Sequence, residues 1–343
     1  MIKQINVTKA FCGLLLLMLS TFISCFQEET YYKATIETSQ VTSITEATAI
    51  CGGMISADGG SNVTARGVCW STTTNPTIEN DTTFDAEGTG PFVSLLKGLS
   101  PSTTYFVRAY AVNKGGAGYG NEVCFTTNAE VVVTDMDGNV YKTVKIGTQR
   151  WMIENLKTTK FNDGTPIPLV TNGAAWTALK TPGYCFYNND VANKSTYGAL
   201  YNWYTVNTNK LAPTGWHVPT DAEWSILENY LIANGYNFDG TTTDNKIAKS
   251  LAATTLWHTN TGVGAIGNDL NKNNKSGFTG LPGGFRRLAS TFDDIGYYGW
   301  WWSSTQGNAK SAWFRYLTYA GGNVNRANYG DMNDGFSVRC IKD

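Results

Sequence analysis

The chain has 343 residues, of which 42% are hydrophobic, enough to bury more than one core and to predict two domains. Charged residues make up only 15%, and 26 Lys and Arg against 27 Asp and Glu leave a net charge of −1, so we expect no nucleic-acid partner. The only histidines are His217 and His258, which argues against His-rich metal sites and most triad chemistry.

Residues 1–24 have the pattern of a secretory signal. Lys3 and Lys9 precede an apolar run over residues 10–19 that is too short to span a bilayer, and small residues follow. Cys25 after a small residue resembles the lipobox of bacterial lipoproteins, which implies lipidation at Cys25 and a membrane anchor; a simple cleaved signal is the alternative. We expect residues 25–31 to be a linker.

The acidic segment 27–29 in that linker resembles the surface-export tag of Bacteroidota lipoproteins, although a solvated acidic linker fits it equally well. We therefore expect an outer-membrane lipoprotein. Whether it faces the outside or the periplasm stays open at this point.

Residues 32–128 read as short strands separated by turn clusters, which predicts an all-β sandwich. Residues 99–105 and 107–113 resemble the E to F region of fibronectin type III domains, and 66–71 with 119–123 resemble a Bacteroidota subfamily of them. The resemblance implies that Tyr105 is the tyrosine-corner residue, a packing role. We expect this fibronectin/Ig-like domain to serve as a spacer.

Of the seven cysteines, Cys12 lies in the signal segment and Cys25 is the predicted lipidation site, which leaves five. Cys51, Cys69 and Cys124 lie in apolar strand-like runs, where a buried free thiol is the ordinary interpretation. Cys185 and Cys340 lie at opposite ends of the second domain and could pair in an oxidising compartment, but sequence does not determine their separation.

The second domain, residues 130–343, begins with a predicted hairpin. Residues 131–146 alternate on both sides of Asp137-Gly138, a strong hairpin pattern. The acidic residues Asp135 and Asp137 also suggest a calcium loop, but the glycine is at the fourth position, where an EF-hand needs it at the sixth. We expect no metal here.

Three helices are predicted in this domain, over residues 197–206, 245–251 and from Asp221 to a stop at 234–235. The last begins with a capping box in which Thr220 caps and Glu223 returns the bond, and Trp224, Leu227 and Leu231 form its buried stripe. We assign Asp221 and Glu223 to capping rather than catalysis. Short strands follow, so the domain is predicted to be α+β.

The motifs of this domain occur in a characteristic order: 134–141, 151–157, 197–203, 215–224, 281–285, 302–304 and 335–340. The set resembles the Fibrobacter succinogenes major paralogous domain and, more remotely, the C-type-lectin-like fold of formylglycine-generating enzymes. The close reactive cysteine pair of those enzymes is missing, as are the Glu-Pro-Asn and Gln-Pro-Asp tripeptides of calcium-dependent lectins. The resemblance therefore implies the fold, without catalysis, calcium or another cofactor.

The stretch from Gly296 to Asp334 is rich in aromatic, amide and guanidinium side chains, a mixture typical of surfaces that bind sugars or proteins. Trp302 and Trp313 are expected to be packed. The predicted ligand-binding residues are Tyr316, Tyr319, Asn323, Asn325, Arg326, Asn328, Tyr329 and Asn333.

Together these features predict a non-catalytic surface lipoprotein whose lectin-like head binds a glycan or a surface protein. One alternative is a structural subunit of a surface assembly. The other is an enzyme of the formylglycine-generating-enzyme-like fold, for which His217 and His258 offer no acidic or nucleophilic neighbours in sequence.

Overall fold

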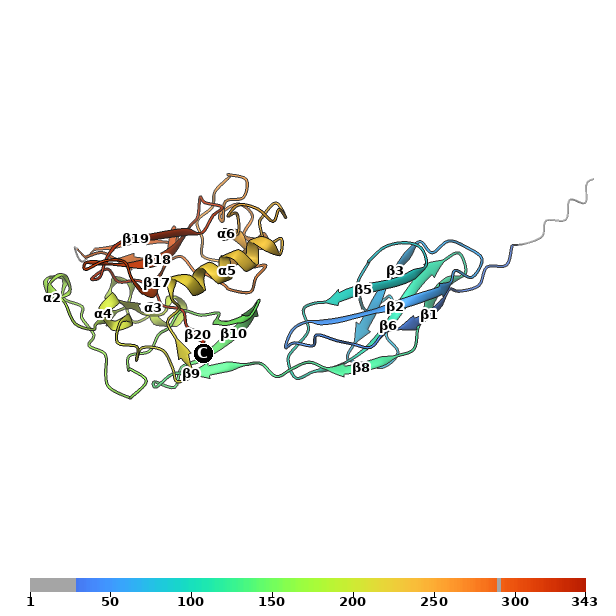
Figure 1. Ribbon diagram of the computed structural model, residues 1–343, viewed down its shortest axis with the longest axis horizontal. Coiled ribbons are helices and arrows are strands. Elements are labelled where there is room, and N and C mark those ends of the chain that lie inside the picture. Colours follow the sequence, from blue (N-terminus) through green and yellow to red (C-terminus); the bar gives the residue numbers. More distant parts are fainter. Residues whose placement is uncertain (1–28, 289–290) are drawn as a thin grey trace, which may run out of the picture. The chain divides into compact units, whose positions relative to one another are not determined.

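The computed structural model describes residues 29–288 and 291–343, and it divides into two compact units, one ending at Ala129 and one spanning Glu130–Asp343 (Figure 1). The predicted signal segment and Cys25 lie outside the described residues. Within the described ranges, no helix is both long and apolar enough to cross a bilayer.

The first unit is a two-layer β-sandwich. One sheet has the order β1-β2-β5 and the other β4-β3-β6-β7, with β8 also paired to β6. A three-stranded sheet faces a five-stranded one, in which β7 and β8 pair with consecutive parts of β6 as one interrupted strand would. This is the fibronectin type III arrangement, which confirms the predicted sandwich. The strands are β1 (Thr35–Thr38), β2 (Ala49–Ala57), β3 (Ala65–Ser71), β4 (Asp81–Thr82), β5 (Gly90–Leu96), β6 (Thr104–Asn113), β7 (Gly116–Tyr119) and β8 (Val123–Thr126).

Tyr105 has the packing role that its resemblance implies. Its ring is buried and stacks on Phe125 with centroids 5.9 Å apart, and its hydroxyl accepts a hydrogen bond from the Ser100 backbone N–H at 3.0 Å. Cys51 and Cys69 are buried, but the prediction of a buried Cys124 is wrong. Side chains alternate along β8, so the inward position of Phe125 turns Cys124 to solvent.

The second unit combines short helices with mainly antiparallel sheets. Its two larger sheets have the orders β14-β20-β11-β10-β9 and β16-β15-β17-β18-β19, and β12 pairs with β13. The strands are β9 (Val132–Thr134), β10 (Val140–Ile146), β11 (Gln149–Met152), β12 (Tyr184–Cys185), β13 (Leu200–Tyr201), β14 (Trp216–His217), β15 (Gly283–Arg286), β16 (Phe292–Ile295), β17 (Tyr298–Gln306), β18 (Ser311–Thr318), β19 (Asn325–Asp331) and β20 (Ile341–Lys342). The helices are α2 (Gly173–Ala178), α3 (Asn193–Tyr197), α4 (Trp203–Val206), α5 (Asp221–Ala233) and α6 (Ala248–Leu251), with 3-10 turns η1 (Tyr187–Asn189) and η2 (Leu270–Lys272).

Strands β9 and β10 form the predicted hairpin, and its turn is organised by one carboxylate. Asp135 accepts hydrogen bonds from the backbone N–H groups of Asp137 and Asn139 at 2.9 and 3.0 Å and from the Tyr141 hydroxyl at 2.5 Å. These donors occupy the oxygens that a calcium loop would turn toward a cation.

Helix α5 begins as its sequence predicts. The Thr220 side chain accepts from the Glu223 backbone N–H, and the Glu223 carboxylate accepts from the Thr220 N–H, so both halves of the capping box are present. Trp224, Leu227 and Leu231 are buried on its inner face. This face packs against the sheet that contains β17 and β18 (Figure 1).

The other two helix predictions are partly wrong. The predicted helix over 197–206 is interrupted at Gly198, whose φ of 78° ends α3, and at Tyr201, whose backbone bridges Phe336 instead of continuing a helix. The predicted helix over 245–251 is shortened to α6, because the Asn245 side chain bonds both backbone groups of Val324. In both places a long-range backbone partner overrides the local pattern.

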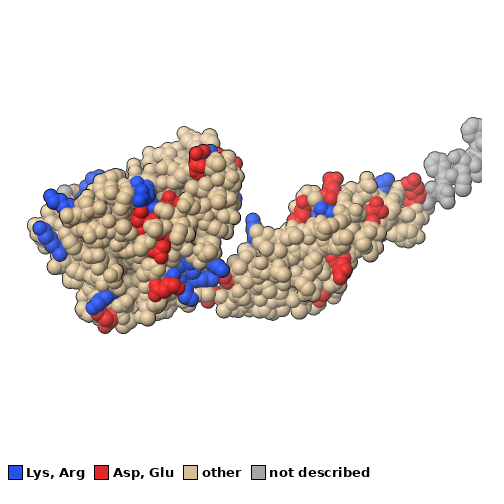
Figure 2. Space-filling model, viewed as in Figure 1, with Lys and Arg blue, Asp and Glu red and all other residues tan. Residues whose placement is uncertain are grey.

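Charged side chains are sparse on the surface. Figure 2 shows Lys and Arg interspersed with Asp and Glu on the face in view, while uncharged residues cover most of it. Interspersed charges of opposite sign produce only a weak long-range field.

Candidate functional site

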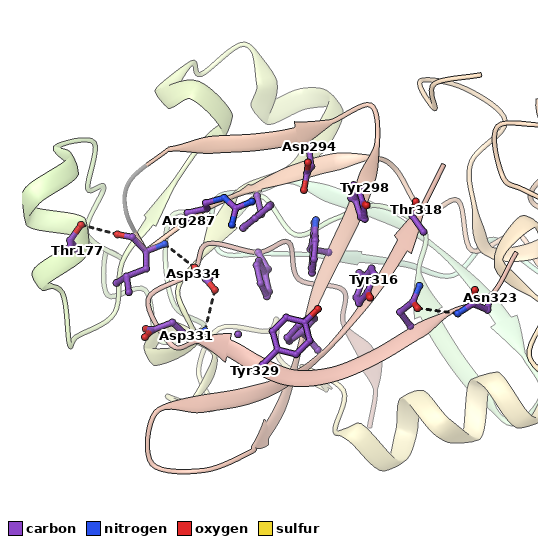
Figure 3. Close-up of a pocket in the computed structure, with 17 residues that line it drawn as sticks. Thr177, Arg287, Asp294, Tyr298, Tyr316, Thr318, Asn323, Tyr329, Asp331 and Asp334 are labelled. Carbon is purple, nitrogen blue, oxygen red and sulfur yellow. Dashed lines mark hydrogen bonds between the residues drawn. The ribbon is translucent and has the colours of Figure 1, made fainter. Parts of the chain in front are cut away.

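A cavity of about 930 Å³ opens on the sheet β16-β15-β17-β18-β19 of the second domain (Figure 3). Its volume is typical of small-ligand sites, which are concave and mostly apolar with a few placed polar groups. The aromatic residues that line it are Phe285, Tyr298, Trp300, Phe314, Tyr316, Tyr329 and Phe336. The polar and charged residues that line it are Thr177, Arg287, Asp294, Thr318, Asn323, Asn325, Asp331 and Asp334.

Pairing of β17 with β18 builds the aromatic floor of this cavity. Tyr298 and Trp300 share one face of β17, and Trp300 is the register partner of Tyr316. The Trp300 ring is nearly parallel to those of Tyr298 and Tyr316, with centroids 5.6 and 4.6 Å apart. Trp300 Nε1 is buried without a hydrogen-bond partner among the described residues, so ring contacts hold the indole in place.

Tyr329 lies at the exposed edge of the cavity. Its side chain is 70% exposed, and its ring meets Phe314 edge-on with centroids 5.3 Å apart (Figure 3). An aromatic ring this exposed leaves most of its apolar surface in water, which folding alone does not favour. Tyr329 is therefore the ring of the cavity most available to a ligand.

Two amides add hydrogen-bonding capacity near the ends of β18 and β19. Asn323 Nδ2 donates to Asn325 Oδ1 at 3.0 Å (Figure 3). This bond orients both amides and leaves their other donors and acceptors for a ligand.

Three carboxylates, those of Asp294, Asp331 and Asp334, also line the cavity. Asp334 accepts the backbone N–H of Leu288 at 2.8 Å and that of Asp331 at 3.1 Å, and burial raises the pKa of Asp334 to about 6. Burial, together with the neighbouring Asp293 carboxylate, also raises the pKa of Asp294. In the described part of the chain, no group of three or more His, Cys, Asp and Glu side chains is placed to hold a metal ion.

Four of the eight predicted ligand-binding residues line the cavity: Tyr316, Asn323, Asn325 and Tyr329. The other four, Tyr319, Arg326, Asn328 and Asn333, lie outside its lining. Arg326 has internal partners, since its guanidinium forms an ion pair with Asp221 at 2.7 Å and lies 3.7 Å from the Trp313 ring centroid. That contact half-buries Trp313, while Trp302 is fully buried as expected.

Asn333 and Tyr319 also have structural neighbours. Asn333 is buried, and its side-chain amide donates to the Thr177 carbonyl at 3.0 Å. The backbone carbonyl of Asn333 accepts the Trp176 indole N–H at 2.7 Å. The Tyr319 ring meets Tyr297 edge-on with centroids 5.1 Å apart. The Asn333 contacts join the segment after β19 to helix α2, and the Tyr319 contact joins the residue after β18 to the residue before β17.

The predicted ligand-binding residues do not include Tyr298 and Trp300, whose rings form the aromatic floor. Both residues belong to the aromatic stretch from Gly296 to Asp334. Their two-residue spacing on one strand, opposite Thr318 and Tyr316 on the next, is the pattern that indicates a shared face. Asp294 comes from β16, whereas Asp331 and Asp334 flank one turn at the end of β19, and no sequence pattern joins Asp294 to the other two.

Asp221 and Glu223 have structural partners, in keeping with their assignment to capping. Arg315 is buried, and its Nη1 pairs with Asp221 at 2.7 Å. Burial alone would raise the pKa of Asp221, but hydrogen bonds from Arg326 and Arg315 outweigh it and lower that pKa. This ion pair joins β18 to the start of α5.

His217 has acidic partners that its sequence neighbourhood did not reveal. Its Nδ1 lies 2.6 Å from Asp343 Oδ1, and its Nε2 lies 2.8 Å from Glu223 Oε1. Burial opposes protonation, but these two carboxylates raise the pKa of His217 overall. His258 stacks on Tyr297 with ring centroids 4.0 Å apart. Neither histidine lines the cavity.

Cys185 and Cys340 do not form the disulfide that the sequence left open. Both thiols are free and buried, and they belong to different hydrophobic clusters. Burial raises the pKa of Cys185 to about 11 and that of Cys340 above its usual range, so neither is a ready thiolate.

The fold and the cavity define a class of protein: a fibronectin-like sandwich followed by a mixed helix-and-sheet domain with an aromatic, polar-lined cavity. The Fibrobacter succinogenes major domain matches residues 144–342, which is more than half of the chain. The chain therefore belongs to the Fibrobacter succinogenes major domain family. No curated protein matches it.

Several solved structures are similar to part of the chain. The sensor domain of the anti-sigma factor RsgI4 of Pseudobacteroides cellulosolvens, in a short form, is 16% identical, with coverage of 29% of this chain and 99% of that one and a TM-score of 0.23. The sixth fibronectin type III domain of human fibronectin type III domain containing protein 3 is 23% identical, with coverage of 31% and 92% and a TM-score of 0.22. The fibronectin type III domain of human KIAA0970 protein is 16% identical, with coverage of 27% and 73% and a TM-score of 0.21.

Proposed function

We propose that the second domain binds a glycan in the aromatic cavity and performs no catalysis. The observation that carries this proposal is an open cavity of about 930 Å³ with a floor of near-parallel rings and an exposed tyrosine at its edge. A sugar ring has an apolar face that packs on aromatic rings and hydroxyls that need both donors and acceptors. Tyr329 and the two amides Asn323 and Asn325 offer both kinds of contact.

The shape of the site favours a glycan over a protein partner. Protein interfaces are broad, about 800 Å² on each side, and their strongest contacts are surrounded by a rim that excludes water. Most of the lining here is gathered in one concavity over a single sheet. Such a cavity fits a few sugar units or the end of a chain better than a wide protein surface.

We further propose that the domain has a C-type-lectin-like fold and that the chain is a lipoprotein anchored at Cys25, with the sandwich as a spacer. The antiparallel pairing of β11 with β20, near the two ends of the domain, supports the fold. The apolar run before Cys25 supports the anchor. A Cys25→Ala variant is expected to leave the membrane fraction, and its retention there would contradict the anchor.

The glycan proposal is tested on a glycan array with the chain that begins after Cys25, beside the variant Tyr329→Ala. Binding to a defined sugar class is expected, and the variant is expected to weaken it by about five- to tenfold, since one aromatic contact contributes about 1 kcal/mol. Tyr32→Ala is the matched control, because Tyr32 is also 70% exposed but belongs to the first domain. Equal loss in both variants, or no glycan bound by folded protein, contradicts the proposal.

A further inference from the structure

The charged groups of the cavity are unevenly balanced. Arg287, Asp294, Asp331 and Asp334 are the charged residues that line it. The guanidinium of Arg287 already forms an ion pair, with its Nε 2.5 Å from Asp293 Oδ2. The lining therefore offers three carboxylates against one cation whose charge is largely matched elsewhere.

The three carboxylates differ in how far the protein satisfies them. Both oxygens of Asp334 accept backbone N–H groups, and Asp331 Oδ1 accepts the Asn333 N–H at 2.9 Å. The side chain of Asp294 forms no hydrogen bond or ion pair among the described residues, although burial opposes its charge strongly enough to raise its pKa. A half-buried carboxylate without a partner gains most from a cation.

We propose that this cavity selects glycans with a free, protonated amine, with Asp294 as the residue that contacts the ammonium group. The inference rests on the proposed glycan-binding function and names its ligand class. Asp294 on β16 and Tyr298 on β17 line the same cavity, so one ligand reaches the carboxylate and the ring floor together (Figure 3). An ammonium group is attracted both to a carboxylate and to the electron-rich face of an aromatic ring.

The same charges disfavour acidic glycans. A uronic acid or sulfate placed on this floor would lie near Asp294, Asp331 and Asp334, and like charges in a partly desolvated site repel. A neutral N-acetylated sugar would keep the ring contacts but offer no cation to Asp294. The cavity is therefore expected to rank amine-bearing sugars first, N-acetylated sugars second and acidic sugars last.

The test compares glucosamine oligomers with fully N-acetylated oligomers of the same length and linkage, by calorimetry just below neutral pH. The amine-bearing oligomer is expected to bind about five- to tenfold more tightly, with a preference that falls as salt rises. Asp294→Asn is expected to abolish the preference and to leave the affinity for the acetylated oligomer within about twofold.

Asp269→Asn is the matched control. Asp269 lies outside the cavity, and like Asp294 it has a left-handed backbone, with φ of 54° against 68°, which asparagine tolerates. The control is expected to keep the full preference.

The outcomes separate the two proposals. If the acetylated oligomer binds as tightly as the amine-bearing one, or if Asp294→Asn and Asp269→Asn behave alike, amine selection is wrong while glycan binding stands. If neither oligomer binds and the glycan array is also blank, the glycan-binding function fails, and the amine selection fails with it.

Discussion

The two faces of the β17–β18 hairpin carry similar residues with different roles. On one face Trp301 and its partner Arg315 are fully buried against the side of the domain that includes α5. On the other face Trp300 and its partner Tyr316 are only partly buried and line the cavity. Consecutive side chains of a strand point to opposite faces, so Trp301 belongs to the core while its neighbour Trp300 lines the cavity.

Trp301→Ala is expected to have the largest effect on stability. The indole is buried, its Nε1 donates to Asn155 Oδ1 at 2.9 Å, and its ring meets Phe278 edge-on. Removal should lower the free energy of unfolding of the second domain by about 3–5 kcal/mol. Of the 11 tryptophans only Trp70 precedes residue 130, so tryptophan fluorescence during urea unfolding reports mainly on this domain. A loss below about 1 kcal/mol would contradict the assignment of this face to the core.

Arg315→Met sharpens the comparison by removing a charge from the buried face. The guanidinium pairs with Glu228 as well as Asp221, and burial already raises the pKa of Glu228. Without Arg315 these carboxylates lose a buried partner, so we expect a loss of about 3 kcal/mol. Adding Glu228→Gln should recover about 1 kcal/mol, because the uncompensated charge is then absent. If the double variant is no more stable than Arg315→Met, an uncompensated charge on Glu228 is not what destabilises the single variant.

Asp221, beside the buried face of the hairpin, and Asp334, in the cavity on the other face, are expected to change the stability of the domain in opposite directions as pH changes. Asp221, with its arginine partners, has a lowered pKa, so its contribution to stability is lost as pH falls through that value. The pKa of Asp334 is raised from 3.8 to about 6, so the folded state holds its proton more tightly than the unfolded chain. The contribution of Asp334 is therefore complete below about pH 4 and is lost as pH rises through about 6.

Asp334→Asn isolates the contribution of Asp334 to the pH dependence of stability, since asparagine is uncharged like the protonated acid. Between pH 4 and pH 7 the wild type should lose about 1–2 kcal/mol of unfolding free energy relative to the variant. Urea unfolding at a series of pH values measures the difference. Parallel pH profiles for the two proteins would show that Asp334 does not titrate with a raised pKa.

Local patterns predicted much of the fold. The alternating strands of the sandwich, the hairpin around Asp137-Gly138 and the capping box of Thr220 and Glu223 each depend on residues close in sequence. The predictions weakened where distant segments decide. Tyr201 left its predicted helix because its backbone bridges Phe336, and Cys124 turned outward because Phe125 packs inward.

The site was only half predicted, for the same reason. Composition selected the aromatic and amide stretch, which includes Tyr316 and Tyr329 of the lining. It could not reveal that Arg326 pairs with Asp221, 105 residues earlier in the chain. Nor could it show that Asp294 on β16 and Asp334 in the turn after β19 line one cavity. Strand register and turn placement determine these neighbours, and neither leaves a pattern in a single sequence.

Tyr329→Ala is expected to have the smallest effect on stability, and that small effect separates binding from folding. Tyr329 and Trp301 both carry aromatic side chains, but Tyr329 is 70% exposed and its ring makes one edge-on contact, with Phe314. Truncation removes little buried area, so the free energy of unfolding should change by less than about 0.5 kcal/mol. The fluorescence-detected urea unfolding used for Trp301→Ala measures it. A loss of 2 kcal/mol or more would mean that the ring serves the core, and weaker glycan binding by this variant could then not be assigned to lost contact.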